Sequence, residues 1–392
     1  MTQNAAASAP SGPLSGITIV DLSTSVSGPF AAGMLAEYGA RVIKVEAPEM
    51  LDAARMTGTS RRGVTAMFAT INRGKEAVVL DLKTDNGKDA LWRVLSAADV
   101  LLQNFRPGAL AKLGFGWETV HRRCPRLIYA SITGFGDTGP LANARVYDPI
   151  IQVASGIADS QINPISGGPM LYQGILCDKV TALHMTQAIT AALFARERGM
   201  ADGQKIDIAM LDAAVHFHWA DGMYNYTFLE DDDVQRVPEF GMFYRLSHVE
   251  DDYITLCLMS DSELRGAMTA MSIEHMLQDE RFKTSQSRLR HHKELGDIFK
   301  ERFATMGFDE LMTQLYAHDV PAGAVIRRSD LATFPQIINN ETICEIEHPV
   351  AGKMHAARPP ARFSQTELSL RHSAPERGQH GQALANEFGF KL

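Results

Sequence analysis

The chain has 392 residues, of which 45% are hydrophobic and 21% charged, and its formal net charge is −8. This length exceeds what one hydrophobic core usually supports, so we expect two domains. The acidic balance argues against a nucleic acid or an anionic membrane surface as partner, and no apolar run approaches the roughly 20 residues needed to span a bilayer.

The spacing of the cysteines and the composition of the N-terminal residues bear on the cellular compartment. Four scattered cysteines form no C-x-x-C pair, so we expect neither a disulfide framework nor a zinc site. The N-terminal MTQNAAASAPSGP lacks the basic start and apolar core of a signal peptide. These features predict a protein of a reducing compartment, the cytoplasm.

The chain opens with a strand–helix–strand pattern. Gly16–Ser23 has the apolar centre of a strand, Ser27 can cap a following helix with Pro29 near its first position, and Arg41–Glu46 is a second strand. Dinucleotide-binding domains begin in this way. The fingerprint G-x-G-x-x-G is absent, however, so the dinucleotide signal is weak.

The same alternation continues along the next 90 residues. Strands are predicted within Glu76–Lys83, over Val100–Phe105 and over Leu127–Ile132, with an amphipathic helix from Asp85 between the first two. Strands alternating with helices predict an α/β domain with a mostly parallel sheet. Ligands of such sheets bind beyond the carboxyl ends of the strands, so the loops that follow them are the candidate site.

A long uncharged segment, Val180–Ala195, predicts a helix that is buried on most faces, and Lys205–Met210 predicts a strand after it. Asp178 lies where the preceding loop turns into this helix. An aspartate in that position is an N-cap in many proteins; the alternative is an ionised nucleophile beside helix N–H groups. For the neighbouring Cys177 we favour a small buried filler over a thiol nucleophile.

Beyond Ala214 the pattern changes. His216 and His218 are two residues apart and point to different sides of a helix, which argues against a shared metal. Met242–Ser247 and Tyr253–Leu258 can pair as a hairpin, and helical segments follow. This stretch predicts a second, smaller α+β domain.

Several blocks of the sequence occur together and in a fixed order. They are GITIVDLS…SGP, GARVIKVEAP, NRGKEAVVLDLK, ADVLLQNFRPG, LGFGWE, PRLIYASITGFGDTGP and YDPIIQVASG, and then D-x-x-T, A-R-x-R-G and G-Q-x-I-D-I-x-M-L-D-A from Asp178 onward. In these blocks the chain resembles the class III CoA-transferases, the family of formyl-CoA transferase, the carnitine CoA-transferases and α-methylacyl-CoA racemase. The resemblance is nearly continuous from about Leu14 to Ala214 and resumes in short stretches up to Phe363.

The resemblance implies an architecture. It implies a discontinuous, Rossmann-like CoA-binding domain over 14–205 and 330–392, with a mostly parallel sheet. A linker helix over 206–225 then leads to a small α+β domain over 226–329. Family members form homodimers in which two ring-like chains interlock, so a homodimer is expected here.

The resemblance also implies the chemistry. Its substrates are an acyl-CoA and a small carboxylic acid, with no permanently bound cofactor and no metal. Asp178 matches the family's nucleophile, which passes through a mixed anhydride and an enzyme–CoA thioester. Arg106 and Lys112 are the expected phosphate partners, whereas Ala47 stands where some members carry arginine. The positions that match CoA contacts are Val26, Ser27, Leu80 to Lys83, Asn104, Phe105, Arg106, Lys112 and Thr133.

Two rival functions stay open. An acyl-CoA racemase or isomerase of the same family uses a histidine where this chain has Tyr147, and an unperturbed phenol with a pKa of about 10 is a poor base. The other rival is an NAD(P)-binding oxidoreductase, or a CoA-binding protein without catalysis. Within the transferases, no glycine run follows Ile206 as it does in formyl-CoA transferase, so oxalate specificity is not supported.

Overall fold

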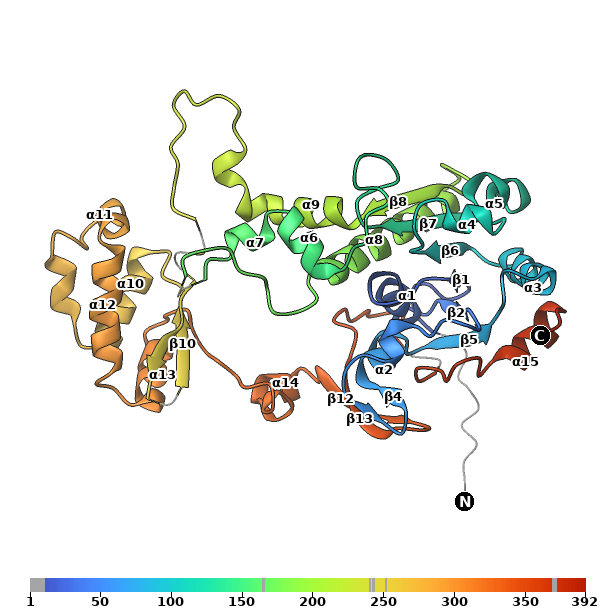
Figure 1. Cartoon of the computed structure of the whole chain (residues 1–392). Helices are drawn as coiled ribbons and strands as arrows, with labels where there is room; N and C mark the ends of the chain where they lie inside the picture. The colour runs from blue at the N-terminus through green and yellow to red at the C-terminus, as the bar shows by residue number, and fades with distance from the viewer. Residues whose placement is uncertain (1–10, 164–165, 240, 242–243, 251, 369–371) are drawn as a thin grey trace, which may run out of the picture. The chain divides into compact units, whose positions relative to one another are not determined.

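The computed structural model describes residues 11–163, 166–239, 241, 244–250, 252–368 and 372–392. The chain forms two compact units, which we call the large unit, Met1–Tyr224 with Glu341–Leu392, and the small unit, Asn225–Asn340 (Figure 1). The helix predicted as a linker over 206–225 belongs to the large unit up to Tyr224, because it packs on the preceding long helix. The chain returns to the large unit at Glu341, whereas the expected return was near 330.

A six-stranded parallel sheet forms the centre of the large unit. Neighbouring strands run in the order β5-β2-β1-β6-β7-β8, and every pairing is parallel. Counted along the chain, this order is 3-2-1-4-5-6, so it reverses between β1 and β6. The prediction of an α/β fold with a large parallel sheet is confirmed. The strands are β1 (Thr18–Asp21), β2 (Arg41–Glu46), β5 (Lys75–Val79), β6 (Val100–Gln103), β7 (Ile128–Thr133) and β8 (Lys205–Ala209).

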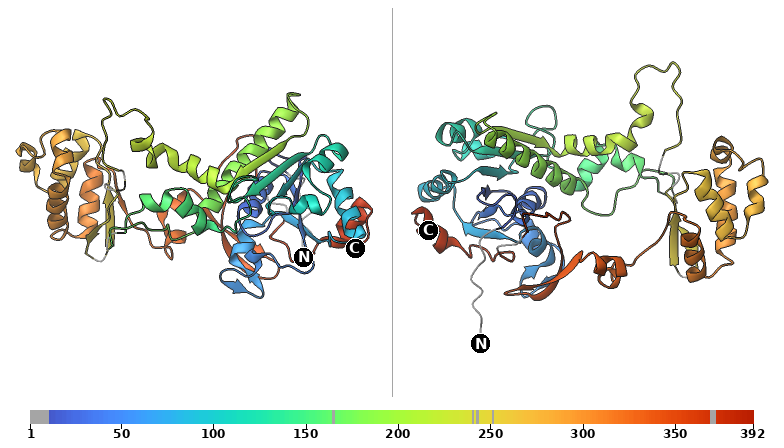
Figure 2. Two further views of the ribbon diagram at one scale, coloured as in Figure 1. Left: turned by 45° about the horizontal axis from the view of Figure 1, so that its top comes forward. Right: turned by 180° about the vertical axis from the view of Figure 1, so that it is seen from behind.

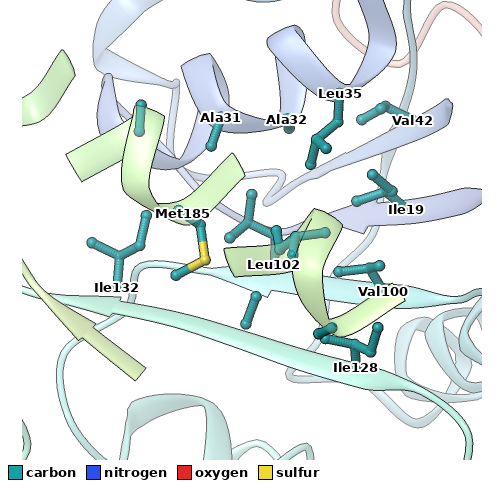
Figure 3. Packing of buried hydrophobic residues seen from close by; sticks show 14 of the residues in the cluster. Ile19, Ala31, Ala32, Leu35, Val42, Val100, Leu102, Ile128, Ile132 and Met185 are labelled. Atoms are coloured by element: carbon teal, nitrogen blue, oxygen red, sulfur yellow. The ribbon is translucent and has the colours of Figure 1, made fainter. Parts of the chain in front are cut away.

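Helices cover both faces of this sheet. Successive side chains of a strand point to opposite faces, so strands with continuous apolar runs need a core on each side. On one side, residues such as Ile19 and Leu102 meet Ala31 of α1 (Ser27–Glu37) and Met185 of α8 (Cys177–Glu197), as Figure 3 shows. On the other side, a second core contains strand residues with α3 (Asp85–Leu95), α5 (Trp117–Arg123) and α15 (Gly381–Phe388).

The C-terminal segment covers the free edge of β5. The Gly74 N–H donates to the carbonyl of His372 at 2.7 Å, and the His380 N–H donates to the carbonyl of Ala77 at 2.9 Å. The Ala77 N–H in turn donates to Nδ1 of His380 at 3.1 Å. Helix α15 then packs beside α3 and β5, as both views of Figure 2 show. An edge that would otherwise expose backbone groups is thereby paired.

The small unit is built on an antiparallel three-stranded sheet with the order β11-β10-β9. The predicted hairpin is present, but its first strand begins at Ser247; residues 242 and 243 lie outside the described residues. Its strands and longer helices are β9 (Ser247–Val249), β10 (Asp252–Leu256), β11 (Ala322–Ala324), α10 (Asp261–Ala270), α11 (Ser285–Arg290), α12 (His292–Phe303) and α13 (Phe308–Ala317).

Short elements complete the described part of the chain, in which no helix is both long and apolar enough to cross a membrane. The short strands are β3 (Ser60–Arg61), β4 (Val64–Thr65), β12 (Ile343–His348) and β13 (Gly352–Ala357). The remaining helices are η1 (Ala53–Arg55), α2 (Ala66–Ile71), α4 (Ala109–Lys112), α6 (Asp148–Ala154), α7 (Ile157–Ser160), α9 (Met210–Gly222), η2 (Tyr224–Tyr226), η4 (Glu274–Gln278), η5 (Leu331–Thr333) and α14 (Pro335–Asn339).

Candidate active site

The loop after β1 lies where the strand order reverses, the usual ligand position in an open parallel sheet. Asn104, just after β6, accepts from the Thr24 N–H at 2.9 Å and donates to the Thr24 carbonyl at 2.8 Å. Ser25 has a φ of +68° and donates its N–H to Asp52 at 3.0 Å. These bonds hold the loop between the carboxyl ends of β1 and β6.

Two buried ion pairs lie beneath this loop. Lys75 pairs with Asp21 at 2.8 Å, and Lys44 pairs with Asp52 at 2.8 Å; all four side chains are buried. Lys44 also donates to the Ser23 carbonyl at 2.9 Å. Burial lowers the pKa of Lys75 to about 8, and the lysine charges hold the pKa of Asp21 below its usual value against the effect of burial. The network holds the loop after β1 in position through the bonds of Lys44 to Ser23 and of Asp52 to Ser25.

Sequence analysis missed this network. The sequence feature that could have revealed it is a lysine or aspartate inside an apolar strand, such as Lys44 in RVIKVE and Asp21 in TIVD. A charged side chain in such a position needs a partner that offsets the loss of hydration. The partners come from other strands and loops, which a single strand pattern does not identify.

Helix α1 approaches the same loop closely. A Cβ on Gly28 would overlap the side chain of Ser23, so only glycine fits at this helix start. Ser27 is the first residue of α1 and Val26 holds the N-cap position, so the predicted N-cap role of Ser27 is wrong. Its side chain and backbone N–H are instead directed to the carboxylate of Asp178 on α8.

Asp178 lies in the first turn of α8, which begins at Cys177. Leu176 holds the N-cap position and Asp178 is the second residue inside the helix, so the N-cap interpretation of Asp178 is wrong. The Asp178 N–H donates to Asp148 Oδ1 at 2.9 Å, and Gln152 Nε2 donates to Asp148 Oδ2 at 2.7 Å. Burial and the nearby Asp148 charge raise the pKa of the half-buried Asp178 to about 6, against the hydrogen bonds from Ser27. This carboxylate is ionised at neutral pH and has few stabilising partners.

Cys177 has the opposite character. Its side chain is fully buried, and burial, with added contributions from Asp148 and Asp178, raises the pKa of its thiol to about 12. A thiol that stays protonated is a weak nucleophile. The structure therefore supports the role of a buried filler.

The expected CoA-contact residues lie in loops and helix ends at the carboxyl edge of the sheet, except for Thr133, which is the last residue of β7. Arg106 and Lys112 are exposed, and within the described ranges their side chains have no ion-pair or hydrogen-bond partner. Lys83 is exposed and pairs with Glu49 at 2.7 Å. The others are the half-buried Val26, Asn104 and Phe105 and the buried Ser27, Leu80 and Thr133.

Part of this set lines one cavity. Phe105, Arg106 and Thr133 border a space of about 120 Å³, together with Trp117 and Lys205. Val26, Ser27, Leu80, Lys83, Asn104 and Lys112 do not line it.

The fold and the ordered sequence blocks from GITIVDLS to the segment around Asp178 indicate a CoA-transferase. Residues 14–381 match CoA-transferase family III, and the chain belongs to this family, which confirms the resemblance seen in the sequence.

Its similarity to known proteins spans nearly the whole chain. It is 33% identical to the succinate–glutarate CoA-transferase of Agrobacterium fabrum over 384 residues, 95% of each chain. It is 28% identical to the human succinyl-CoA:glutarate CoA-transferase, over 96% of this chain and 86% of that protein. The crystal structure of a CAIB/BAIF family protein from Brucella suis matches with a TM-score of 0.83 at 31% identity, over 96% of this chain and 100% of that one.

Proposed function

We propose that this protein transfers CoA from an acyl-CoA thioester to a free carboxylic acid, with Asp178 as the nucleophile. The observation that supports the proposal most directly is the position of Asp178. It is a half-buried carboxylate at a helix start, beside Ser27 and next to the loop where the strand order reverses. A nucleophile with few partners in a partly dry site suits attack on a thioester.

The proposed reaction conserves the thioester energy because every step is an exchange between acyl groups. Asp178 attacks the donor carbonyl, CoA thiolate leaves, and a mixed anhydride forms. The thiolate then attacks the aspartyl carbonyl, so the donor acid leaves and an aspartyl–CoA thioester remains. The acceptor carboxylate repeats the two steps in the opposite direction, which forms the new acyl-CoA and regenerates Asp178. Backbone N–H groups near Ser27 are candidate donors to the tetrahedral oxyanion.

We further propose that CoA binds to the large unit as to a Rossmann-like domain. The strand order 3-2-1-4-5-6, which reverses between β1 and β6, supports this proposal, because open parallel sheets commonly bind ligands at such a reversal. Arg106 and Lys112 are the proposed partners of the CoA diphosphate, because both are exposed cations near that edge. Val26, Ser27, Asn104, Phe105 and Thr133 are proposed to contact the rest of the molecule.

Substrate screening tests the function directly. We would incubate the protein with pairs of acyl-CoAs and free acids and follow new acyl-CoAs by mass spectrometry. Succinate, glutarate and oxalate come first in the panel, because relatives carry these acids in their names. Binding of NAD(P) with hydride transfer, or CoA binding with no exchange on the whole panel, would contradict the proposal.

The pH dependence of the transfer rate should reflect the protonation of the Asp178 carboxylate. Transfer is expected to fall as pH drops through about 6, because the protonated carboxyl cannot attack. Asp148→Asn keeps an oxygen for the Asp178 N–H but removes a charge, so the midpoint should move to lower pH. Initial rates on both sides of pH 6 measure this, with Asp89→Asn in the exposed Asp89–Arg93 pair as control. An unmoved midpoint in Asp148→Asn would show that this charge does not act on Asp178.

The racemase alternative makes a separate prediction. Tyr147 precedes α6, is 74% exposed and takes the place of the racemase histidine. We therefore expect no appreciable deuterium at the α-carbon of a 2-methylacyl-CoA incubated with the protein in heavy water. Mass spectrometry of the recovered thioester measures this, with a racemase as positive control. Rapid incorporation would assign the protein to the racemase branch.

We also propose an interlocked homodimer in the cytoplasm. Large apolar side chains are exposed on three helices of the large unit, among them Val153, Leu183, Phe194 and Phe217, and such surfaces commonly mark an interface. Sedimentation at micromolar concentration is expected to show a dimer that dissociates slowly, because interlocked chains must partly unfold to separate. A stable, active monomer would rule out the interlocked arrangement.

A further inference from the structure

The segment that begins at Pro375 is fastened to the end of β2. Glu46, the last residue of β2, forms a two-bond ion pair with Arg55 at 2.8 and 2.9 Å. The same guanidinium donates to the carbonyl of Pro375 at 3.2 Å. Since Glu46 is buried, this connection ties the C-terminal segment to the carboxyl edge of the sheet.

Arg377 then crosses from the end of β5 to the end of β2. Its Nη2 donates to the carbonyls of Ala47 at 2.6 Å and Pro48 at 2.7 Å. The next residue, Gly378, has a φ of +69° and lies against Val79, the last residue of β5. The side chain is exposed, and its Nη1 and Nε make no hydrogen bond or ion pair to the described residues. The guanidinium is thus oriented by two carbonyls and keeps free donors.

This cation lies beside the β5 end of the proposed CoA site. The Leu80 N–H donates to the carbonyl of Glu46 at 3.0 Å, one residue before the Ala47 carbonyl that Arg377 binds. Lys83 extends from the same loop and pairs with Glu49, with both side chains more than 70% exposed. An exposed pair of this kind is weak, so Lys83 can exchange its partner for a stronger anion.

We propose that Arg377, together with Lys83, binds the 3′-phosphate of coenzyme A. The inference rests on the proposed CoA-binding function and extends it, since it assigns a second cationic group. CoA carries phosphate at two places, the diphosphate and the 3′-position of the ribose. The chain offers two separate cationic groups: Arg106 and Lys112 follow β6, whereas Arg377 and Lys83 lie at β2 and β5. Because β2 and β6 flank β1 on opposite sides, the ends of these two strands are about two strand spacings apart, roughly 10 Å.

Two ligands, CoA and 3′-dephospho-CoA, test the proposed contact between Arg377 and the 3′-phosphate. CoA and 3′-dephospho-CoA differ only in the 3′-phosphate, so calorimetric titration of both compares the same protein with and without it. Arg377→Gln is expected to weaken CoA binding by roughly tenfold, the lower end for a charge-assisted bond at an exposed site, and to leave 3′-dephospho-CoA binding unchanged. Arg377→Lys keeps a charge and should retain part of the preference for CoA.

Two matched controls complete the design. Arg106→Gln should weaken both ligands equally, because both carry the diphosphate. Arg126→Gln removes an exposed arginine at the opposite end of the sheet and should change neither. An equal loss of both ligands in Arg377→Gln would show that Arg377 only fastens the C-terminal segment, and would overturn the assignment. A wild-type protein that binds neither ligand would overturn the proposed function itself.

Discussion

Asp178→Ala is expected to lower the rate of CoA transfer by on the order of 10⁴-fold or more, while CoA binding and the fold persist. The carboxylate is the proposed nucleophile, and the neighbouring Cys177 is a poor replacement because burial raises the pKa of its thiol to about 12. Steady-state rates and calorimetric CoA binding on the same preparation measure the two properties.

The stability of this variant is a second readout. The pKa of Asp178 is raised from 3.8 to about 6, so the folded chain holds the proton more tightly than the unfolded chain. Folded-state stability therefore decreases as pH rises from about 4 to 6, and the ionised carboxylate is unfavourable at pH 7. Removal of the charge in Asp178→Ala should leave the free energy of unfolding at pH 7 unchanged or slightly higher. Loss of an N-cap would instead lower it by about 0.5–2 kcal/mol.

Covalent trapping identifies the attacking residue. Hydroxylamine added with an acyl-CoA should convert an activated Asp178 to its hydroxamate, seen as a mass shift on the peptide that contains it. The Asp178→Ala protein provides the control and should show no shift. Full turnover by Asp178→Ala, or an acyl adduct on Cys177, would falsify the proposed mechanism.

Asp21→Ala is expected to lower the free energy of unfolding by about 3–5 kcal/mol, the range for a buried ion pair that loses one partner. Lys75 would keep its bonds to the Pro29 carbonyl and to Asn72 Oδ1, both 2.8 Å, but it would lose its ion-pair partner. The pKa of Lys75 is already lowered to about 8, so the loss should shrink at higher pH, where this lysine is neutral. Urea unfolding at pH 7 and pH 9 measures both effects.

An exposed ion pair provides the matched comparison. Asp89→Ala breaks the surface pair with Arg93 on α3 and should cost less than about 1 kcal/mol. A loss of similar size for Asp21→Ala would indicate that water reaches Lys75 and that the network does not hold the loop after β1. The transfer rate of the two variants gives a further test, because only Asp21 lies beneath that loop.

The local sequence was enough to predict the α/β alternation and the family, and it singled out Asp178 as the candidate nucleophile. Buried parallel strands are short apolar runs, and helix starts carry local signals, so both can be recognised within a few neighbouring residues. The order of the sequence blocks, from GITIVDLS to the segment around Asp178, carried the family resemblance. The same local signals were wrong for the capping roles of Ser27 and Asp178, because each side chain has a distant partner that local reasoning does not see.

Only the tertiary structure decided which charges meet. Asp21 and Lys75 are 54 residues apart, Asp148 and Asp178 are 30 apart, and Arg377 lies 330 residues from the carbonyl of Ala47. Such pairs depend on strand order and on the return of the C-terminal segment, neither of which leaves a periodic pattern in the sequence. A carboxylate's charge and pKa depend on burial and on these partners, so the environment of Asp178 follows from the fold and not from its local motif.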